Sequence, residues 1–254
     1  MSQAFEVCAA VLQQRFGEGV SCDVVSVDGD PTGLWRAEQK LVARAVPSRQ
    51  REFAAGRACA RALLARLGFE PAALLRASDS APLWPRGAIG SIAHDGRRCA
   101  VAVARAGQFS SLGLDIEPDE PLEDELWPEL FLPRELATLA ACSRQERGRV
   151  ARVLFSAKEC VYKCTHALVR ATLGFQDVEI VLARGSERFQ ARLRHRGGSA
   201  PVSAVLEGFQ FACAGSILTG MAMTSPPERP ARRPTTALSL TMRALQFRRK
   251  GARR

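Results

Sequence analysis

Two short apolar segments near the middle of the chain constrain its fold more than any other feature. Residues 99–104 (CAVAVA) and 111–117 (SLGLDIE) have the length and composition of strands, a glycine-containing turn joins them, and Pro118 ends the second. Strands need cover from other elements, and long stretches typical of helices lie on both sides, at 49–67 and 145–173. We therefore expect an α+β fold.

Turn and capping residues mark the other elements. The helix at 49–67 should follow Pro47, with Ser48 as its N-cap and Gly68 as its stop. The segment PLWPRGAIG (82–90) is punctuated by proline and glycine and leads to His94, so we expect His94 to follow a turn. Further helices are expected at 4–16, 34–45 and 133–141, and further strands at 22–27, 179–183, 188–193 and 209–215.

The net charge of +10 is concentrated at one end of the chain. From Ser225 onward there are nine Lys or Arg and one Glu, which leaves 27 basic and 25 acidic residues before that point. We therefore expect no specific nucleic-acid binding by the fold, and a disordered basic tail over residues 225–254. Leu238, Met242 and Leu245 have helical spacing, so a helix for a partner or a membrane surface is the alternative for this tail.

The N-terminus lacks the charged, then apolar, then small-residue pattern of an export signal, and no apolar run approaches the ~20 residues of a membrane span. A soluble, cytoplasmic and monomeric protein is expected. The eight cysteines include no CxxC pair, and we expect most to be buried thiols. Cys160, Cys164 and His166 lie close in the sequence, but without a second ligand pair they are a weak zinc motif.

The chain contains only four lysines among 36 basic residues, and two of them lie in one short motif. In FSAKECVYK (155–163), Lys158 precedes Glu159, and Lys163 follows Glu159 by one helical turn. An exposed surface ion pair is the ordinary explanation for such a motif. The functional interpretation makes Glu159 a metal ligand or general base and Lys163 a neutraliser of phosphate charge.

A pair of carboxylates at the end of a strand is the second candidate feature. In LDIE, Asp115 and Glu117 should point to one face of the strand while Leu114 and Ile116 point into the core. Such a pair often only makes a surface polar. It also suits Mg²⁺, which binds one or two protein carboxylates and completes its shell with water and phosphate oxygens.

Cationic and histidine side chains form the third candidate feature. His94 is one of three histidines, and Arg49 and Arg57 lie eight residues apart on the expected helix 49–67. These groups could bind phosphates, or they could be a structural histidine and surface arginines. Each feature is ambiguous by itself.

The order of these features resembles a known family. GSIAH, GLDIE and FSAKECVYK follow one another as the three signature blocks do in the Sfp-type 4'-phosphopantetheinyl transferases. The resemblance covers residues from about 45 to 182. Three segments look like the branch that contains the enterobactin synthetase transferases: RQREFAAGRACAR (49–61), PLWPRGAIGSIAHDGRRCAVAVA (82–104) and GFQDVEI (174–180).

The resemblance implies a Mg²⁺-dependent enzyme that transfers 4'-phosphopantetheine from coenzyme A to a serine of an apo acyl or peptidyl carrier protein. The other product is 3',5'-ADP. It implies that Asp115, Glu117 and Glu159 bind magnesium, with Glu159 as candidate base and Lys163 beside the phosphate that reacts.

It also implies coenzyme A contacts by Arg49 and Arg57 at the nucleotide end, and by His94, Lys158 and Lys163 at the phosphates. Two positions depart from the family pattern. Ala93 stands where Ser or Thr is usual, which removes a hydroxyl contact that Ser91 or backbone amides would have to replace. Cys160 stands where Ser or Ala is common, and it should pack without strain.

In this family the fold consists of two similar halves related by a pseudo-twofold axis, with the site in the cleft between them. We expect the halves at residues 1–107 and 108–224. Three alternatives remain at this point: a metal-dependent nuclease or phosphohydrolase, a non-catalytic protein that binds through its basic tail, and a family member that binds coenzyme A without turnover.

Overall fold

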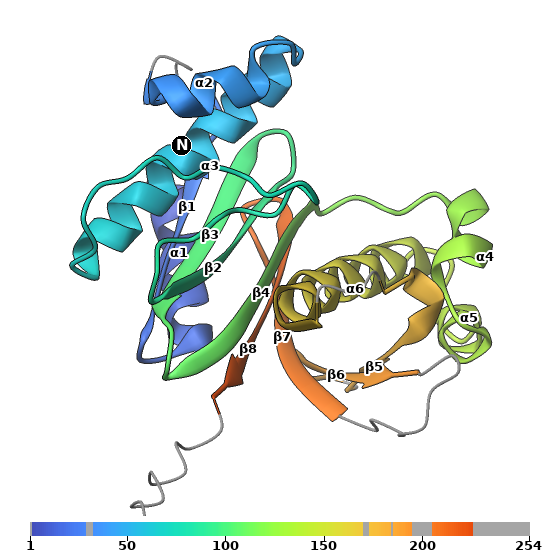
Figure 1. Cartoon of the computed structure of the whole chain (residues 1–254). Helices are drawn as coiled ribbons and strands as arrows, with labels where there is room; N and C mark the ends of the chain where they lie inside the picture. The colour runs from blue at the N-terminus through green and yellow to red at the C-terminus, as the bar shows by residue number, and fades with distance from the viewer. Residues whose placement is uncertain (1, 29–32, 170–172, 184, 195–204, 226–254) are drawn as a thin grey trace, which may run out of the picture.

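The computed structural model describes residues 2–28, 33–169, 173–183, 185–194 and 205–225. These residues form two antiparallel sheets, with strand orders β1-β3-β2 and β4-β8-β7-β6-β5, and helices pack against both sheets (Figure 1). The α+β class expected from the sequence is confirmed.

The smaller sheet contains β1 (Val20–Ser26), β2 (Ala88–His94) and, between them, β3 (Arg98–Arg105). The small apolar residues of CAVAVA suit this central strand, because all six are buried and helices cover both faces. One face packs on α3 and the other on α1. The helices of this half are α1 (Ser2–Phe16), α2 (Arg36–Val42) and α3 (Pro47–Arg66).

The larger sheet curves around one long helix, α6 (Arg147–Val169), as Figure 1 shows. Its strands are β4 (Phe109–Pro118), β5 (Val178–Leu182), β6 (Arg188–Leu193), β7 (Val205–Cys213) and β8 (Ser216–Thr224). Shorter elements complete this half: α4 (Trp127–Leu130), α5 (Pro133–Ala140) and the 3-10 turns η2 (Asp124–Leu126) and η3 (Phe175–Asp177).

Strands β2 and β4 lie next to each other where the two halves meet. The backbone N–H of Leu114 donates to Ser91 Oγ at 3.1 Å, so one serine of β2 ties the two strands together. Leu114 and Ile116 then point into a core shared with Ala93 and α1. The alternate residues of β4 consequently face α6, which is how the candidate carboxylates reach that helix.

Most expected elements are confirmed within one to four residues of their bounds, and three expectations are wrong. Helix α3 begins at Pro47 with Val46 as its N-cap, so Ser48 lies inside the helix. Residues 88–94 form strand β2, so His94 ends a strand instead of following a turn. The expected strand 209–215 is two strands, because Ala214 and Gly215, both with positive φ, form the turn between β7 and β8.

Five of the eight cysteines follow the expectation of buried thiols, whereas Cys142 is only half-buried. Cys22, Cys59, Cys99, Cys160 and Cys164 are buried free thiols, and Cys160 packs in the core beneath α6 as expected. Cys8 and Cys213, however, form a disulfide across a separation of 205 residues. The sequence does not indicate this pair, because only the packing of α1 on β7 and β8 brings the two positions together.

Strands β3 and β4 belong to different sheets, so the chain passes from one sheet to the other at the boundary between the expected halves 1–107 and 108–224. The division into these two halves stays a prediction. The expected basic tail lies outside the described residues after Ser225. In the part of the chain that the structure describes, no helix has both the length and the apolarity to cross a membrane.

The close approach of α6 to β4 generates a stability prediction. A Cβ atom at Gly113 would overlap the carbonyl oxygen of Cys160 and lie 2.8 Å from Cys164 Cβ, so Gly113→Ala must push the helix away from the strand. We expect a loss of ~1–3 kcal/mol in the free energy of unfolding, measured by urea denaturation. Gly33→Ala is the matched control, because nothing lies within 4 Å of its added Cβ. Equal effects of the two substitutions would contradict this account.

Candidate functional site

One face of α6 carries polar side chains that meet the carboxylates of β4. Arg152, Ser156, Glu159 and Lys163 recur at helical spacing and line the side of α6 that turns toward β4 and the cleft beside it. Opposite them, the expectation that Asp115 and Glu117 share one face of the strand is met, since both bond to residues of this stripe.

Asp115 is the best-anchored carboxylate of this group. It is buried, its Oδ2 accepts a hydrogen bond from Ser156 Oγ at 2.8 Å, and its Oδ1 accepts one from Lys163 Nζ at 2.5 Å. Ser156 is itself held by Thr219 of β8 at 2.9 Å. Burial would lower the pKa of Lys163, but the negative charges of Asp115 and Glu159 outweigh it and raise the pKa. Lys163 therefore stays protonated at neutral pH.

Glu117 lies farther along β4, where Arg152 Nη1 donates to its Oε2 at 3.0 Å. Burial, followed by the charge of Asp115, raises the pKa of Glu117 to about 7 against the opposing effect of Arg152. Glu117 is thus partly protonated at neutral pH, which is unusual for a carboxylate with an arginine partner.

Glu159 leaves α6 beside a small pocket. Burial raises the pKa of Glu159, Asp115 adds to the effect, and Lys163 opposes it. A carboxylate with a raised pKa is a better proton acceptor than an ordinary one. Glu159 is therefore more basic than an ordinary carboxylate, and it borders a pocket.

His94 comes from the first half, where the end of β2 brings it to the start of α3. Its imidazole contacts Arg49 and lies 3.4 Å from Glu52 Oε2, which also accepts a hydrogen bond from Arg49 at 3.0 Å. Burial lowers the pKa of His94, and Arg49 and Lys163 act in the same direction against Glu52 and Asp115. Because its pKa is lowered, the imidazole of His94 is neutral at neutral pH, and it lies beside the cationic side chain of Arg49.

Arg57 also lies on α3, where it is buried. Its Nε donates to the carbonyl of Leu74 at 2.7 Å, and the guanidinium lies over the ring of Phe53. Among the described residues its two Nη nitrogens have no hydrogen-bond partner. Burial lowers the pKa of Arg57 to about 10, which means that its charge is poorly compensated. A bound anion would compensate it.

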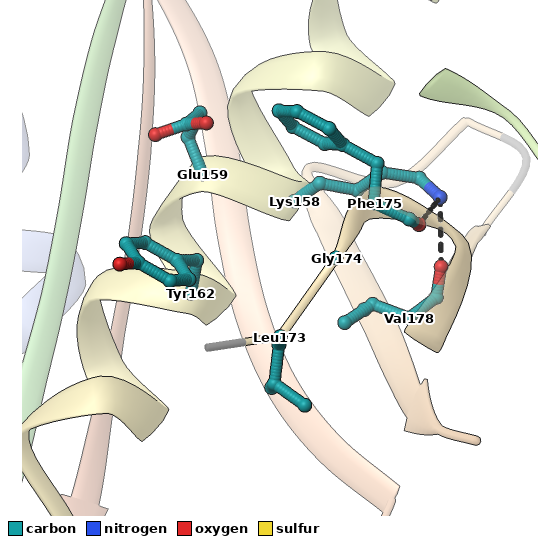
Figure 2. A pocket seen from close by; sticks show the side chains of 7 residues that line it. All are labelled: Lys158, Glu159, Tyr162, Leu173, Gly174, Phe175 and Val178. Carbon is teal, nitrogen blue, oxygen red and sulfur yellow. Dashed lines mark hydrogen bonds between the residues drawn. The ribbon is translucent and has the colours of Figure 1, made fainter. Parts of the chain in front are cut away.

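Lys158 does not join the group. Figure 2 shows Lys158 and Glu159 leaving α6 in different directions, with Lys158 Nζ bonded to the carbonyls of Phe175 and Val178, each at 2.7 Å. It also forms a buried ion pair with Glu135 at 2.8 Å. The phosphate contact that the family resemblance implies for Lys158 has no support in this geometry, because its ammonium faces the interior.

Two pockets border the polar face of α6. A pocket of about 200 Å³, drawn in Figure 2, has mostly apolar walls from Leu173, Phe175 and Val178, with Glu159 at its edge. A pocket of about 480 Å³ lies between the halves, with Trp84 of the first half and Lys163 of the second in its walls. Tyr162 lines both pockets.

The chemistry of the carboxylates suits a hard cation, although their arrangement is not a finished metal site. Asp115 raises the pKa of both Glu117 and Glu159, so a divalent cation would relieve repulsion that the protein leaves in place. Within the described ranges, however, no three His, Cys, Asp or Glu side chains are placed to hold an ion as they stand. Asp115 and Glu117 are each paired with a cation instead. The Cys160, Cys164 and His166 set does not converge either, because His166 pairs with Asp79.

The sequence interpretation missed Ser156, Arg152 and Glu52. The first two lie at helical spacing with Glu159 and Lys163, so the 3.6-residue period could have found them. Glu52 lies three residues after Arg49. Ser91 does not replace the hydroxyl that Ala93 lacks, since its Oγ is occupied by β4 and Ala93 is packed in the core.

Comparisons with known proteins show which family the chain matches. A family model described as the 4'-phosphopantetheinyl transferase N-terminal domain matches residues 37–104, and one described as the 4'-phosphopantetheinyl transferase superfamily matches residues 111–214. The chain is similar to the 4'-phosphopantetheinyl transferase Svp of Streptomyces mobaraensis, with 40% identity over 78% of this chain and 82% of the relative. It is also similar to PptT of Mycobacterium tuberculosis, with 34% identity over 76% of this chain and 88% of the relative. A match to Npt of Nocardia iowensis, 40% identical, covers 57% of this chain and 64% of the relative.

The raised pKa of Glu117 generates a pH-dependent prediction. The folded state holds the Glu117 proton more tightly than the unfolded state, so this group reduces stability as pH rises from about 4.5 to about 7. Glu117→Gln cannot ionise, and its amide oxygen can still accept from Arg152. In metal-free buffer the variant should therefore gain on the order of 1–3 kcal/mol in unfolding free energy over the wild type between about pH 5 and pH 8. A difference that does not change with pH would refute the shift.

Proposed function

Because the chain belongs to the 4'-phosphopantetheinyl transferase superfamily, we propose that it transfers the 4'-phosphopantetheine arm of coenzyme A to a serine of an apo acyl or peptidyl carrier protein. The observation that carries the proposal within the molecule is the position of Lys163 and Glu159. Each borders a different pocket, and the two residues lie one helical turn apart.

Coenzyme A has the chemistry that this arrangement would accept. It carries a nucleotide at one end, a long and weakly polar arm at the other, and a diphosphate between them. The larger pocket has the size for the nucleoside, and the apolar pocket suits the arm. A molecule that spans both would place its diphosphate beside Lys163 and Glu159.

The phosphates and the nucleotide end would be held mainly by cations of the first half. Arg57 offers two Nη nitrogens that have no hydrogen-bond partner within the described ranges, and Arg49 contacts His94. Phosphates bound there would compensate the positive charge of Arg57, whose pKa is lowered by burial. Lys158 has no part in this binding, because its ammonium faces the interior and bonds to Phe175, Val178 and Glu135.

The chemical step breaks the phosphoanhydride bond of the diphosphate and forms a phosphate ester bond to the serine. The oxygen of the carrier serine attacks the phosphorus next to the pantetheine arm, and the bond from that phosphorus to the oxygen of 3',5'-ADP breaks. Glu159 takes the serine proton, for which its raised pKa suits it. Lys163 donates to the phosphate oxygens as negative charge moves onto the leaving group.

We propose Mg²⁺ as the cofactor, held by Asp115, Glu117 and Glu159. When bound, the cation supplies positive charge to both phosphates. Two features of the chain support this proposal: Ser156 fixes the orientation of Asp115, and burial, followed by the charge of Asp115, raises the pKa of Glu117.

The segments that look like the enterobactin synthetase branch favour carriers of siderophore or other peptide synthesis. Carriers of fatty acid and polyketide synthesis present the same serine chemistry. We propose a monomeric enzyme that acts in the cytoplasm, where apo carrier proteins are made.

The activity is tested by incubating the protein with coenzyme A, Mg²⁺ and apo carrier domains of several pathways, with mass spectrometry to detect the pantetheine adduct. Glu159→Gln and Lys163→Ala should each lower the transfer rate by at least about 100-fold, because they remove the base and the charge beside the phosphate. Lys40→Ala, at an exposed lysine of α2, is the control and should transfer like the wild type. Wild-type rates in the first two variants would remove their assigned roles. Degradation of nucleic acid in place of transfer would favour the nuclease alternative.

The cation is tested separately from turnover. Isothermal titration of Mg²⁺ into the protein saturated with coenzyme A should show binding that Asp115→Ala weakens by at least about 10-fold. Asp119→Ala, which removes a carboxylate paired with Arg149 outside the cluster, should bind Mg²⁺ like the wild type. Equal Mg²⁺ affinities in the two variants would count against Asp115 as a ligand.

A further inference from the structure

The deepest ion pair of the second half lies just behind the catalytic face of α6. Glu135 and Lys158 are 2% and 1% exposed, and Glu135 Oε2 lies 2.8 Å from Lys158 Nζ. The same carboxylate accepts from the backbone N–H groups of Leu132 and Ile180, each at 2.7 Å. One side chain thus joins the start of α5, the middle of α6 and strand β5. We call Glu135 and Lys158 the second-half clamp.

The first half contains the same device. Glu38 is fully buried, its carboxylate accepts from the N–H groups of Trp35 and Leu74 at 2.9 Å, and it pairs with Arg61 at 2.6 Å. Like Glu135, it is the third residue of a short helix and caps that helix's own start. The cation follows the carboxylate by 23 residues in both halves. We call Glu38 and Arg61 the first-half clamp.

The two clamps differ in what lies beside them. Arg61 faces the rim of the first half, where its Nη2 also donates to the carbonyl of Gly33. Lys158 directly precedes Glu159, and the carbonyls it holds belong to Phe175 and Val178, which line the apolar pocket. The second-half clamp therefore fixes the turn of α6 that carries Glu159 against the wall of the pocket.

Counting donors excludes a direct role for Lys158 in binding phosphate. An ammonium group has three N–H donors. Glu135 and the carbonyls of Phe175 and Val178 occupy all three, and almost none of the side chain reaches solvent. A phosphate could bind only if the clamp opened and left the Glu135 carboxylate buried without its cation.

We propose that Glu135 and Lys158 are positioning residues, which hold Glu159 and the pocket wall in register for transfer, with no contact between the Lys158 ammonium and the phosphates of coenzyme A. This inference rests on the transferase function proposed above. A shift of Glu159 by a fraction of a helical turn would move the base away from the carrier serine, so the clamp should affect the chemical step more than nucleotide binding.

The test compares Lys158→Met with Arg61→Met, which removes the cation of the first-half clamp. In each variant the carboxylate keeps its two backbone donors, so both should fold, with lowered melting temperatures. Steady-state transfer to an apo carrier should show kcat reduced on the order of 10- to 100-fold in Lys158→Met. In Arg61→Met, kcat should stay within about twofold of the wild type, since Arg61 bonds to Glu38 and Gly33 of the first half and to no segment that carries Glu159.

Affinity for 3',5'-ADP, measured by calorimetry without turnover, separates positioning from phosphate contact. This affinity should be unchanged in Lys158→Met. If the lysine contacted the 5'-phosphate that 3',5'-ADP keeps from the diphosphate, the variant would bind this product more weakly. Glu135→Gln, which keeps the shape of the side chain, should repeat the pattern of lowered kcat with unchanged 3',5'-ADP affinity, and it serves if Lys158→Met does not fold.

Three results would overturn the inference while the wild type still transfers: an unchanged kcat in Lys158→Met and Glu135→Gln, an equal loss of kcat in Arg61→Met, or a loss of 3',5'-ADP affinity in Lys158→Met. Absence of transfer by the wild type would instead overturn the proposed function, and this inference with it.

Discussion

The close contact between α6 and β4 is the constraint on which the rest of the site depends. Gly113 lets the backbone of the helix approach the strand, and Ser111 Oγ donates to the carbonyl of Cys164 at one end of the contact. At the other end the same approach brings Ser156 and Lys163 onto Asp115. A bulkier residue at Gly113 would separate the carboxylates of the strand from Glu159 and Lys163 of the helix.

Burial then decides the electrostatics of this contact. The effect of burial on the carboxylates outweighs the effect of the neighbouring cations, so the pKa values of Glu117 and Glu159 are raised. Lys163 stays charged. In the first half the poorly compensated charge is positive instead, because burial lowers the pKa of Arg57. One side of the cleft therefore favours added cations and the other favours added anions. A metal–diphosphate substrate satisfies both demands.

Two buried carboxylates outside the candidate site connect the elements of each half. Buried carboxylates at Glu38 and Glu135 tie a short helix, a long helix and the following segment together in each half. The two carboxylates occupy matching positions in their halves, although the sheets of the two halves differ, with three and five strands among the described residues. The core that α1 shares with β3 and β4 joins the halves behind the cleft.

Local sequence determined the helices, most strands and the residues that could carry chemistry, because helical and strand periods are short-range properties. The spacing in LDIE was enough to place Asp115 and Glu117 on one face, and the glycine at position 68 was enough to end α3. Only the tertiary structure decided which neighbours each side chain meets. The motif FSAKE gives no reason to assign Lys158 and Glu159 to different places. In the fold, Lys158 pairs with a carboxylate 23 residues away, whereas Glu159 borders the apolar pocket. The disulfide between Cys8 and Cys213 and the donor from Ser156 to Asp115 likewise depend on contacts between segments distant in sequence. No local pattern encodes such contacts, since they form when whole faces of helices and sheets pack together.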